Sequence, residues 1–155
     1  MNKNKDLTIE ETFNLAIKNH QEGKTDIAQE LYNQVLKNNP NHSQALNNLA
    51  VIFTNLKEYQ KAKDCYKKAI ESDPNYADVH NNLGVVFKDL GENQKAKRCY
   101  EKAIELNPNY VNAYYNIGLV CKELGEYQKS KKSFEKVIEL NPNYVNAHNN
   151  LGAIF

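Results

Sequence analysis

The spacing of the prolines is the feature that most limits what this chain can fold into. The chain has four prolines, and each follows the one before it by 34 residues: Pro40, Pro74, Pro108 and Pro142. Glycines repeat in the same step at Gly23, Gly91 and Gly125, with Lys57 where a fourth is expected. A fixed period of this length is typical of stacked supersecondary units, each of which buries its apolar face on its neighbours.

The sequence between successive prolines predicts two helices. One helix is expected from Ala77 to about Leu90, where Gly91 ends it by taking a left-handed conformation at no steric cost. A second is expected from about Asn93 to about Leu106, where an Asn-Pro-Asn turn stops it. Lys57 is expected to take the glycine turn at a cost of about 1 kcal/mol. The asparagines after the prolines are expected to cap the following helices: Asn75, Asn109 and Asn143.

Aligning the units on their prolines predicts an N-terminal arm, four helix pairs and the first helix of a fifth pair. The expected bounds are 1–8 for the arm, 9–42, 43–76, 77–110 and 111–144 for the pairs, and 145–155 for the partial pair. Apolar residues recur at helical spacing, with a bulky ring on each second helix at Tyr32, Tyr66, Tyr100 and Phe134. One pair cannot bury these rings alone, so the pattern predicts an all-α stack of helix pairs.

Composition narrows the class of function. A formal net charge of +1 disfavours nucleic acid as the ligand. No apolar run reaches the roughly 18 residues that span a bilayer, so no membrane partner is expected. The polar N-terminus and the odd number of cysteines (Cys65, Cys99 and Cys121) favour a reducing, cytoplasmic location. There is no phosphate-binding loop and no metal-ligand spacing, so we expect no catalytic residue, no metal, no cofactor and no enzyme activity.

These residues resemble the tetratricopeptide repeat. Counted from the first residue of each unit, the family pattern has a small residue at positions 8 and 20, an aromatic residue at 24 and proline at 32. All four complete units match at these positions. The resemblance implies a right-handed α-solenoid of antiparallel helix pairs. It also implies that the first helix of each pair lines a concave groove, which binds peptides or protein segments.

Position 6 of the first helix, on the face that the resemblance places in the groove, is asparagine in every unit. This asparagine ladder consists of Asn14, Asn48, Asn82, Asn116 and Asn150. Asparagine is a poor helix former, so its recurrence invites a role in binding. Each carboxamide can donate and accept, and a row of them can hold the backbone of an extended peptide. The row resembles the ladder in the superhelical repeats of protein O-linked N-acetylglucosamine transferases. Alternatively, these asparagines are solvated and were copied with the repeats.

Other positions on the same face complete the predicted peptide site. The residues at position 2 are expected to determine which peptides bind, and so is Glu123. The position 2 residues are Gln44, Asp78 and Asn112. Position 9 offers apolar contact or packs between first helices, through Val51, Val85 and Leu119. The residues before three ladder asparagines are expected to widen the polar strip: Asn47, Asn81 and Asn149. A clamp for a chaperone C-terminal carboxylate is not expected, because its cationic positions hold Asp78 and Asn82.

The sequence therefore predicts a protein-protein interaction scaffold that binds an extended peptide in a concave groove. Two alternatives stay open: the substrate-recruiting region of a larger enzyme such as a glycosyltransferase, and an assembly or oligomerisation scaffold. The helix that begins at Val145 has no second helix to cover it. We therefore expect either a fragment of a longer chain or a homodimer through this helix.

Overall fold

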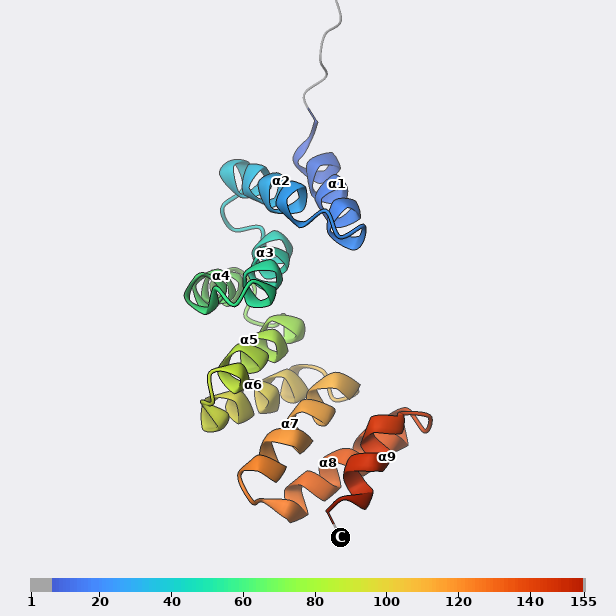
Figure 1. Ribbon diagram of the computed structural model, residues 1–155. Coiled ribbons are helices and arrows are strands. Elements are labelled where there is room, and N and C mark those ends of the chain that lie inside the picture. Colours follow the sequence, from blue (N-terminus) through green and yellow to red (C-terminus); the bar gives the residue numbers. More distant parts are fainter. Residues whose placement is uncertain (1–6, 155) are drawn as a thin grey trace, which may run out of the picture. The chain divides into compact units, whose positions relative to one another are not determined.

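The computed structural model describes residues 7–154, so residues 1–6 of the predicted arm and Phe155 of the predicted fifth pair lie outside it. These residues form nine α-helices and no strand (Figure 1). The bounds are α1 Ile9–Gln21, α2 Thr25–Asn38, α3 Ser43–Asn55, α4 Tyr59–Ser72, α5 Ala77–Asp89, α6 Asn93–Leu106, α7 Val111–Glu123, α8 Tyr127–Leu140 and α9 Val145–Gly152. None of these helices is long and apolar enough to cross a bilayer.

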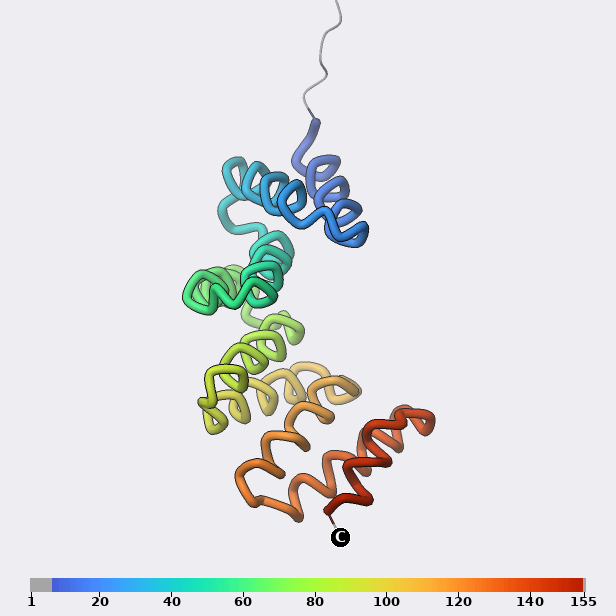
Figure 2. The backbone as a smooth tube through the Cα atoms, viewed as in Figure 1, coloured from blue at the N-terminus to red at the C-terminus, as the bar shows by residue number. Residues whose placement is uncertain are grey.

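The helices fall into two compact units, one ending at Pro74 and the other beginning at Asn75. The first unit contains the pairs α1–α2 and α3–α4, and α2 also packs on α3. The second contains the pairs α5–α6 and α7–α8, with α6 packed on α7 and α8 packed on α9. Figure 2 shows the backbone reversing direction in a short turn between the helices of each pair. Each unit is thus a stack of helix pairs, which confirms the predicted all-α solenoid class.

In the second unit, a buried ring on the second helix of each pair lies directly on the first helix. Tyr100 of α6 and Phe134 of α8 are both fully buried. A methyl group on Gly84 would lie 2.6 Å from the Tyr100 ring, and one on Gly118 would lie 2.7 Å from the Phe134 ring. The Ser130 hydroxyl also donates to the Gly118 carbonyl at 2.8 Å. These contacts leave no room for a side chain between α5 and α6 or between α7 and α8.

The turn inside each pair requires a left-handed residue. Gly23, Gly91 and Gly125 have φ of 74°, and Lys57 has φ of 60°. The expected lysine turn is therefore confirmed. A side chain with a Cβ is strained in this conformation, because the Cβ approaches the following carbonyl oxygen.

The predicted asparagine caps are wrong. The N-cap residues of α5, α7 and α9 are Tyr76, Tyr110 and Tyr144, and none has a side-chain capping hydrogen bond. The asparagine after the proline lies one residue too early to cap. Instead its N–H donates to the asparagine before the proline, from Asn109 to Asn107 Oδ1 at 3.1 Å and from Asn143 to Asn141 Oδ1 at 3.3 Å. The asparagines therefore close the turn rather than start the helix.

Replacing Lys57 with glycine should raise the free energy of unfolding by about 1 kcal/mol, because the left-handed strain is removed. Urea unfolding followed by circular dichroism measures this change. The reciprocal variant Gly91→Lys should lose a similar amount, since no atom lies within 4 Å of a Cβ at Gly91 and only the backbone opposes it. Equal stabilities of Lys57→Gly and the parent chain would contradict the expectation.

Replacing Gly118 with alanine should destabilise the fold by about 1 to 3 kcal/mol, because the buried Phe134 ring cannot move away from the new methyl group. The matched control is Gly152→Ala in α9, where a Cβ meets nothing within 4 Å. The control should shift the thermal midpoint little or upward. A comparable loss in both variants would show that helix-pair contact is not the cause.

Candidate functional site

The second unit carries three ladder residues on successive first helices: Asn82 on α5, Asn116 on α7 and Asn150 on α9. Asn116 Nδ2 donates to Asn81 Oδ1 at 3.1 Å, and Asn81 Nδ2 donates to Asn82 Oδ1 at 3.3 Å. This relay joins the ladder carboxamides of two adjacent helix pairs. Asn81 is only 5% exposed, as is Asn47 in the first unit, so the prediction that these two widen the polar strip is wrong.

Asn150 and Asn116 differ in how many of their carboxamide atoms are still available to hydrogen-bond a ligand. Asn150 Nδ2 donates to the Tyr115 hydroxyl at 3.3 Å and to the Asn146 carbonyl at 2.9 Å, and its Oδ1 accepts from Lys122 at 3.5 Å. Both amide hydrogens of Asn150 are therefore used within the protein. The relay uses one amide hydrogen of Asn116, so its second hydrogen and its Oδ1 can meet a ligand. Both side chains are partly exposed.

The residues predicted to tune specificity lie at the surface, and neighbours fix two of them. Gln44, Asp78 and Asn112 are exposed. Burial and a hydrogen bond to the Asp78 carboxylate raise the pKa of the Tyr110 hydroxyl. Glu123 accepts from Asn93 Nδ2 at 3.0 Å. Asp78 and Glu123 therefore present negative charge in held orientations.

The aliphatic residues of position 9 have a packing role. Val51, Val85 and Leu119 are partly buried. Val85 packs against the core cluster that contains Tyr100, and Leu119 packs against the cluster that contains Phe134. They join the first helices to the core of the stack and leave part of each side chain exposed.

In the first unit, Asn14 and Asn48 border different pockets. Asn14 and Gln44 are brought together in a pocket of 470 Å³ that Phe13 and His42 also line. Asn48 lines a second pocket of 380 Å³, which we call the Tyr32 pocket. Its lining residues are Ile17, His20, Gln21, Tyr32 and Asn48, from α1, α2 and α3.

Tyr32 lies at the base of this pocket with an unsatisfied hydroxyl. The residue is fully buried, and its hydroxyl has no hydrogen bond of good geometry to any residue that the structure describes. Burial raises the pKa of Tyr32, and the approach of the Asn48 carboxamide opposes this shift. Burial also raises the pKa of Tyr66, one repeat later, to about 12, and the approach of the Thr54 hydroxyl opposes this shift. Sequence reasoning missed Tyr32 because it treated the rings of position 24 only as core. The signal was available in Phe134, which fills the same position without a hydroxyl.

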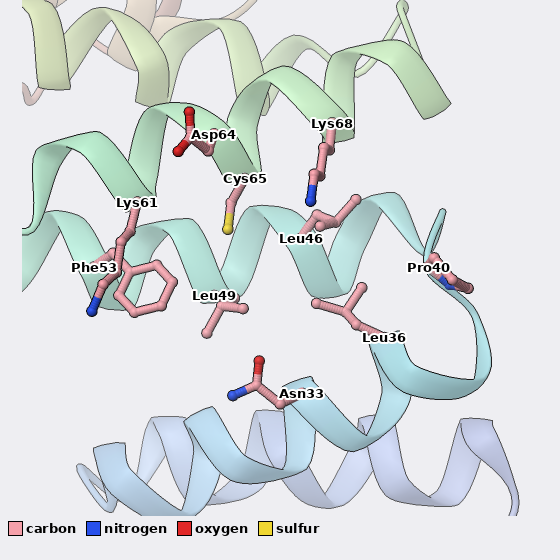
Figure 3. Close-up of a pocket in the computed structure, with 10 residues that line it drawn as sticks. All are labelled: Asn33, Leu36, Pro40, Leu46, Leu49, Phe53, Lys61, Asp64, Cys65 and Lys68. Carbon is pink, nitrogen blue, oxygen red and sulfur yellow. The ribbon is translucent and has the colours of Figure 1, made fainter.

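A third cavity, of 370 Å³, lies between α2, α3 and α4 (Figure 3). Leu46, Leu49 and Phe53 of α3 form its apolar floor. Figure 3 shows the Cys65 sulfur and the Lys68 side chain of α4 pointing towards these leucines. Burial raises the pKa of the Cys65 thiol, so the thiol is protonated at neutral pH and reacts slowly. No predicted site residue lines this cavity.

Replacing Tyr32 with phenylalanine should leave the free energy of unfolding unchanged or raise it by up to about 1 kcal/mol, because a buried hydroxyl without a partner is removed. Urea unfolding of the variant and of the parent chain measures this change. A loss of about 1 kcal/mol or more in Tyr32→Phe would mean that the Tyr32 hydroxyl is bonded in the folded chain.

The chain resembles a known protein family in sequence. Two sequence profiles described as tetratricopeptide repeat match the chain, one at residues 43–76, 77–110 and 111–144 and the other at residues 13–42. A comparison with curated protein sequences gives no significant match.

Solved structures resemble the chain over most of its length. A crystal structure of MamA is 30% identical, with 90% of this chain and 81% of that chain covered and a TM-score of 0.81. PilF of Pseudomonas aeruginosa is 26% identical, with 94% and 67% covered and a TM-score of 0.87. The first TPR of Spaghetti (RPAP3), bound to the HSP90 peptide SRMEEVD, is 28% identical, with 72% and 89% covered and a TM-score of 0.71.

Proposed function

Because the chain belongs to the tetratricopeptide repeat family, we propose that it is a protein-interaction scaffold that binds an extended peptide along its asparagine ladder. The Spaghetti (RPAP3) structure, which holds a peptide, supports a peptide as the class of ligand. An acidic peptide of that kind is not the ligand proposed here. Positions 2 and 6 of the third helix pair hold Asp78 and Asn82, which offer a carboxylate no cation.

The relay from Asn116 through Asn81 to Asn82 is the observation that carries this proposal. A buried asparagine holds the Asn116 amide in one orientation, so less conformational entropy is lost when a ligand binds. The second amide hydrogen of Asn116 can donate to a backbone carbonyl of the ligand, while Oδ1 accepts from a backbone N–H. Such contacts read the ligand backbone rather than its side chains.

The spacing of the ladder suits an extended chain. Neighbouring helices pack about 8–10 Å apart, and an extended peptide rises about 3.3 Å per residue. Within the second unit, Asn82 and Asn116 can therefore meet residues of the ligand that lie about three apart. In the first unit Asn48 offers the same group. Asn150, with both amide hydrogens engaged, contributes less.

Selection from a phage-displayed library of random 12-residue peptides provides a ligand and does not require the natural partner. The selected peptide is then titrated by isothermal calorimetry against the parent chain and the triple variant Asn48→Ala, Asn82→Ala, Asn116→Ala. Each lost hydrogen bond is worth about 0.5 to 1.5 kcal/mol, so the triple variant should bind at least about tenfold more weakly. Circular dichroism verifies that the helices are retained.

The matched control removes three carboxamides from the second helices, one per repeat at one repeat position: Gln60→Ala, Gln94→Ala, Gln128→Ala. All three glutamines are exposed. This control should bind the selected peptide as the parent chain does. The proposal fails if no peptide is selected, or if the two triple variants lose the same affinity.

A further inference from the structure

We infer that the Tyr32 pocket is a subsite for one uncharged, hydrogen-bonding side chain of the peptide ligand, with a carboxamide as the best fit. The inference rests on the proposed function, because Asn48 is both a ladder residue and a wall of this pocket. It adds a specificity determinant to a ladder that otherwise reads only backbone.

The unsatisfied hydroxyl of Tyr32 is the first reason. A buried hydroxyl without a partner lowers the stability of the fold. Packing does not require it, because Phe134 occupies the same repeat position and is just as deeply buried. The Tyr32 hydroxyl therefore has no role in holding the helix pair together, and its place in a pocket assigns it to a ligand.

The histidine beside the ring is the second reason. His20 lines the pocket, and its ring meets the Tyr32 ring edge-on with centroids 6.1 Å apart. The same repeat position holds Thr54, Lys88 and Lys122 in the other three repeats. The imidazole in the wall of the pocket is therefore particular to the first repeat.

The chemistry of the lining decides the class of ligand group. Asn48, Gln21 and the Tyr32 hydroxyl each donate and accept hydrogen bonds, and Ile17 adds an aliphatic wall. No lysine, arginine, aspartate or glutamate stands among the residues that line the pocket. A charged ligand group would therefore find no ammonium, guanidinium or carboxylate partner among the lining side chains. A carboxamide, which both donates and accepts, matches the lining, and 380 Å³ lies within the usual size of ligand pockets, about 300–1,000 Å³.

Entry of the ligand involves Asn48. The Tyr32 hydroxyl is buried, and Asn48 approaches it without a well-formed hydrogen bond. A ligand carboxamide that turns Asn48 outward gains the hydroxyl as a partner and gives up the hydrogen bond that Asn48 Oδ1 accepts from Asn47 Nδ2 at 3.2 Å. Asn48 remains on the wall and can pair with the adjoining ligand backbone.

The repeat-equivalent residues of the second unit differ in charge. Ile17, His20 and Gln21 correspond to Val85, Lys88 and Asp89. The Tyr100 hydroxyl, equivalent to that of Tyr32, also has no partner within residues 7–154. A probe with an uncharged side chain should therefore perturb the first unit selectively.

The test uses the full chain, labelled with ¹⁵N, and three blocked amino acids as probes. N-acetyl-glutamine methylamide should shift the side-chain amide resonances of Gln21 and Asn48 in a saturable way. N-acetyl-glutamate methylamide and N-acetyl-leucine methylamide carry the same backbone and should cause no saturable shift there. The Tyr32→Phe variant should bind the glutamine probe at least fivefold more weakly than the parent chain.

Tyr66→Phe is the matched control, because it removes a hydroxyl at the same repeat position from a ring outside the pocket. It should bind the glutamine probe as the parent chain does. The inference is overturned if the glutamine probe causes no saturable shift, if the glutamate probe binds equally well, or if Tyr32→Phe keeps full affinity.

If a phage-selected peptide binds through the asparagines while the glutamine probe fails, the subsite is refuted and the proposed function stands. If the probe binds as expected but no peptide is selected, the pocket is supported and the proposed function falls.

Discussion

The contact between a buried ring and the small residue beneath it is the constraint on which the second unit depends. Tyr100 on Gly84 and Phe134 on Gly118 bring the two helices of a pair so close that a single added methyl group would clash. This closeness removes the rings from water and sets the rotation of each first helix about its axis. The rotation in turn decides which side chains of that helix face the neighbouring pair and which face solvent.

Two adjacent asparagines show the effect of this helix rotation on the burial of side chains. Asn81 and Asn82 are adjacent in sequence, yet Asn81 is buried between helix pairs while Asn82 stays partly exposed. Asn81 then accepts from Asn116 of the next pair, so one buried carboxamide orients two surface ones. A polar group at this depth is tolerated because it is hydrogen-bonded on both sides. The relay therefore makes Asn116 and Asn82 part of the contact between repeats, as well as part of the surface that we propose for a ligand.

Two buried tyrosine hydroxyls do not contribute to the stability of the fold, which suggests that they serve binding instead. The buried hydroxyls of Tyr32 and Tyr100 meet no partner among the residues that the structure describes. A phenylalanine in their place would pack as Phe134 does and would cost the fold nothing. Retaining a costly polar atom beside a pocket is typical of sites where ligand contacts, rather than folding, determine the side chain. The residues around these two hydroxyls differ in charge between the two units.

The sequence by itself determined the helical fold and the places where helices begin and end. The expected helices of the third pair agree with α5 and α6 to within one residue, and the strained turn at Lys57 was predicted from the glycines around it. These features follow from local properties that can be read from the order of residues. They are the φ values that each residue allows, the missing N–H of proline and the helical spacing of apolar residues. The tertiary structure alone decided that Asn81 is buried, that Asn150 is held by Tyr115 and that the buried Tyr32 hydroxyl has no partner among the described residues. Each of these features depends on distances between atoms of different helices. The period of 34 residues predicts that the helices repeat, but it does not specify those distances.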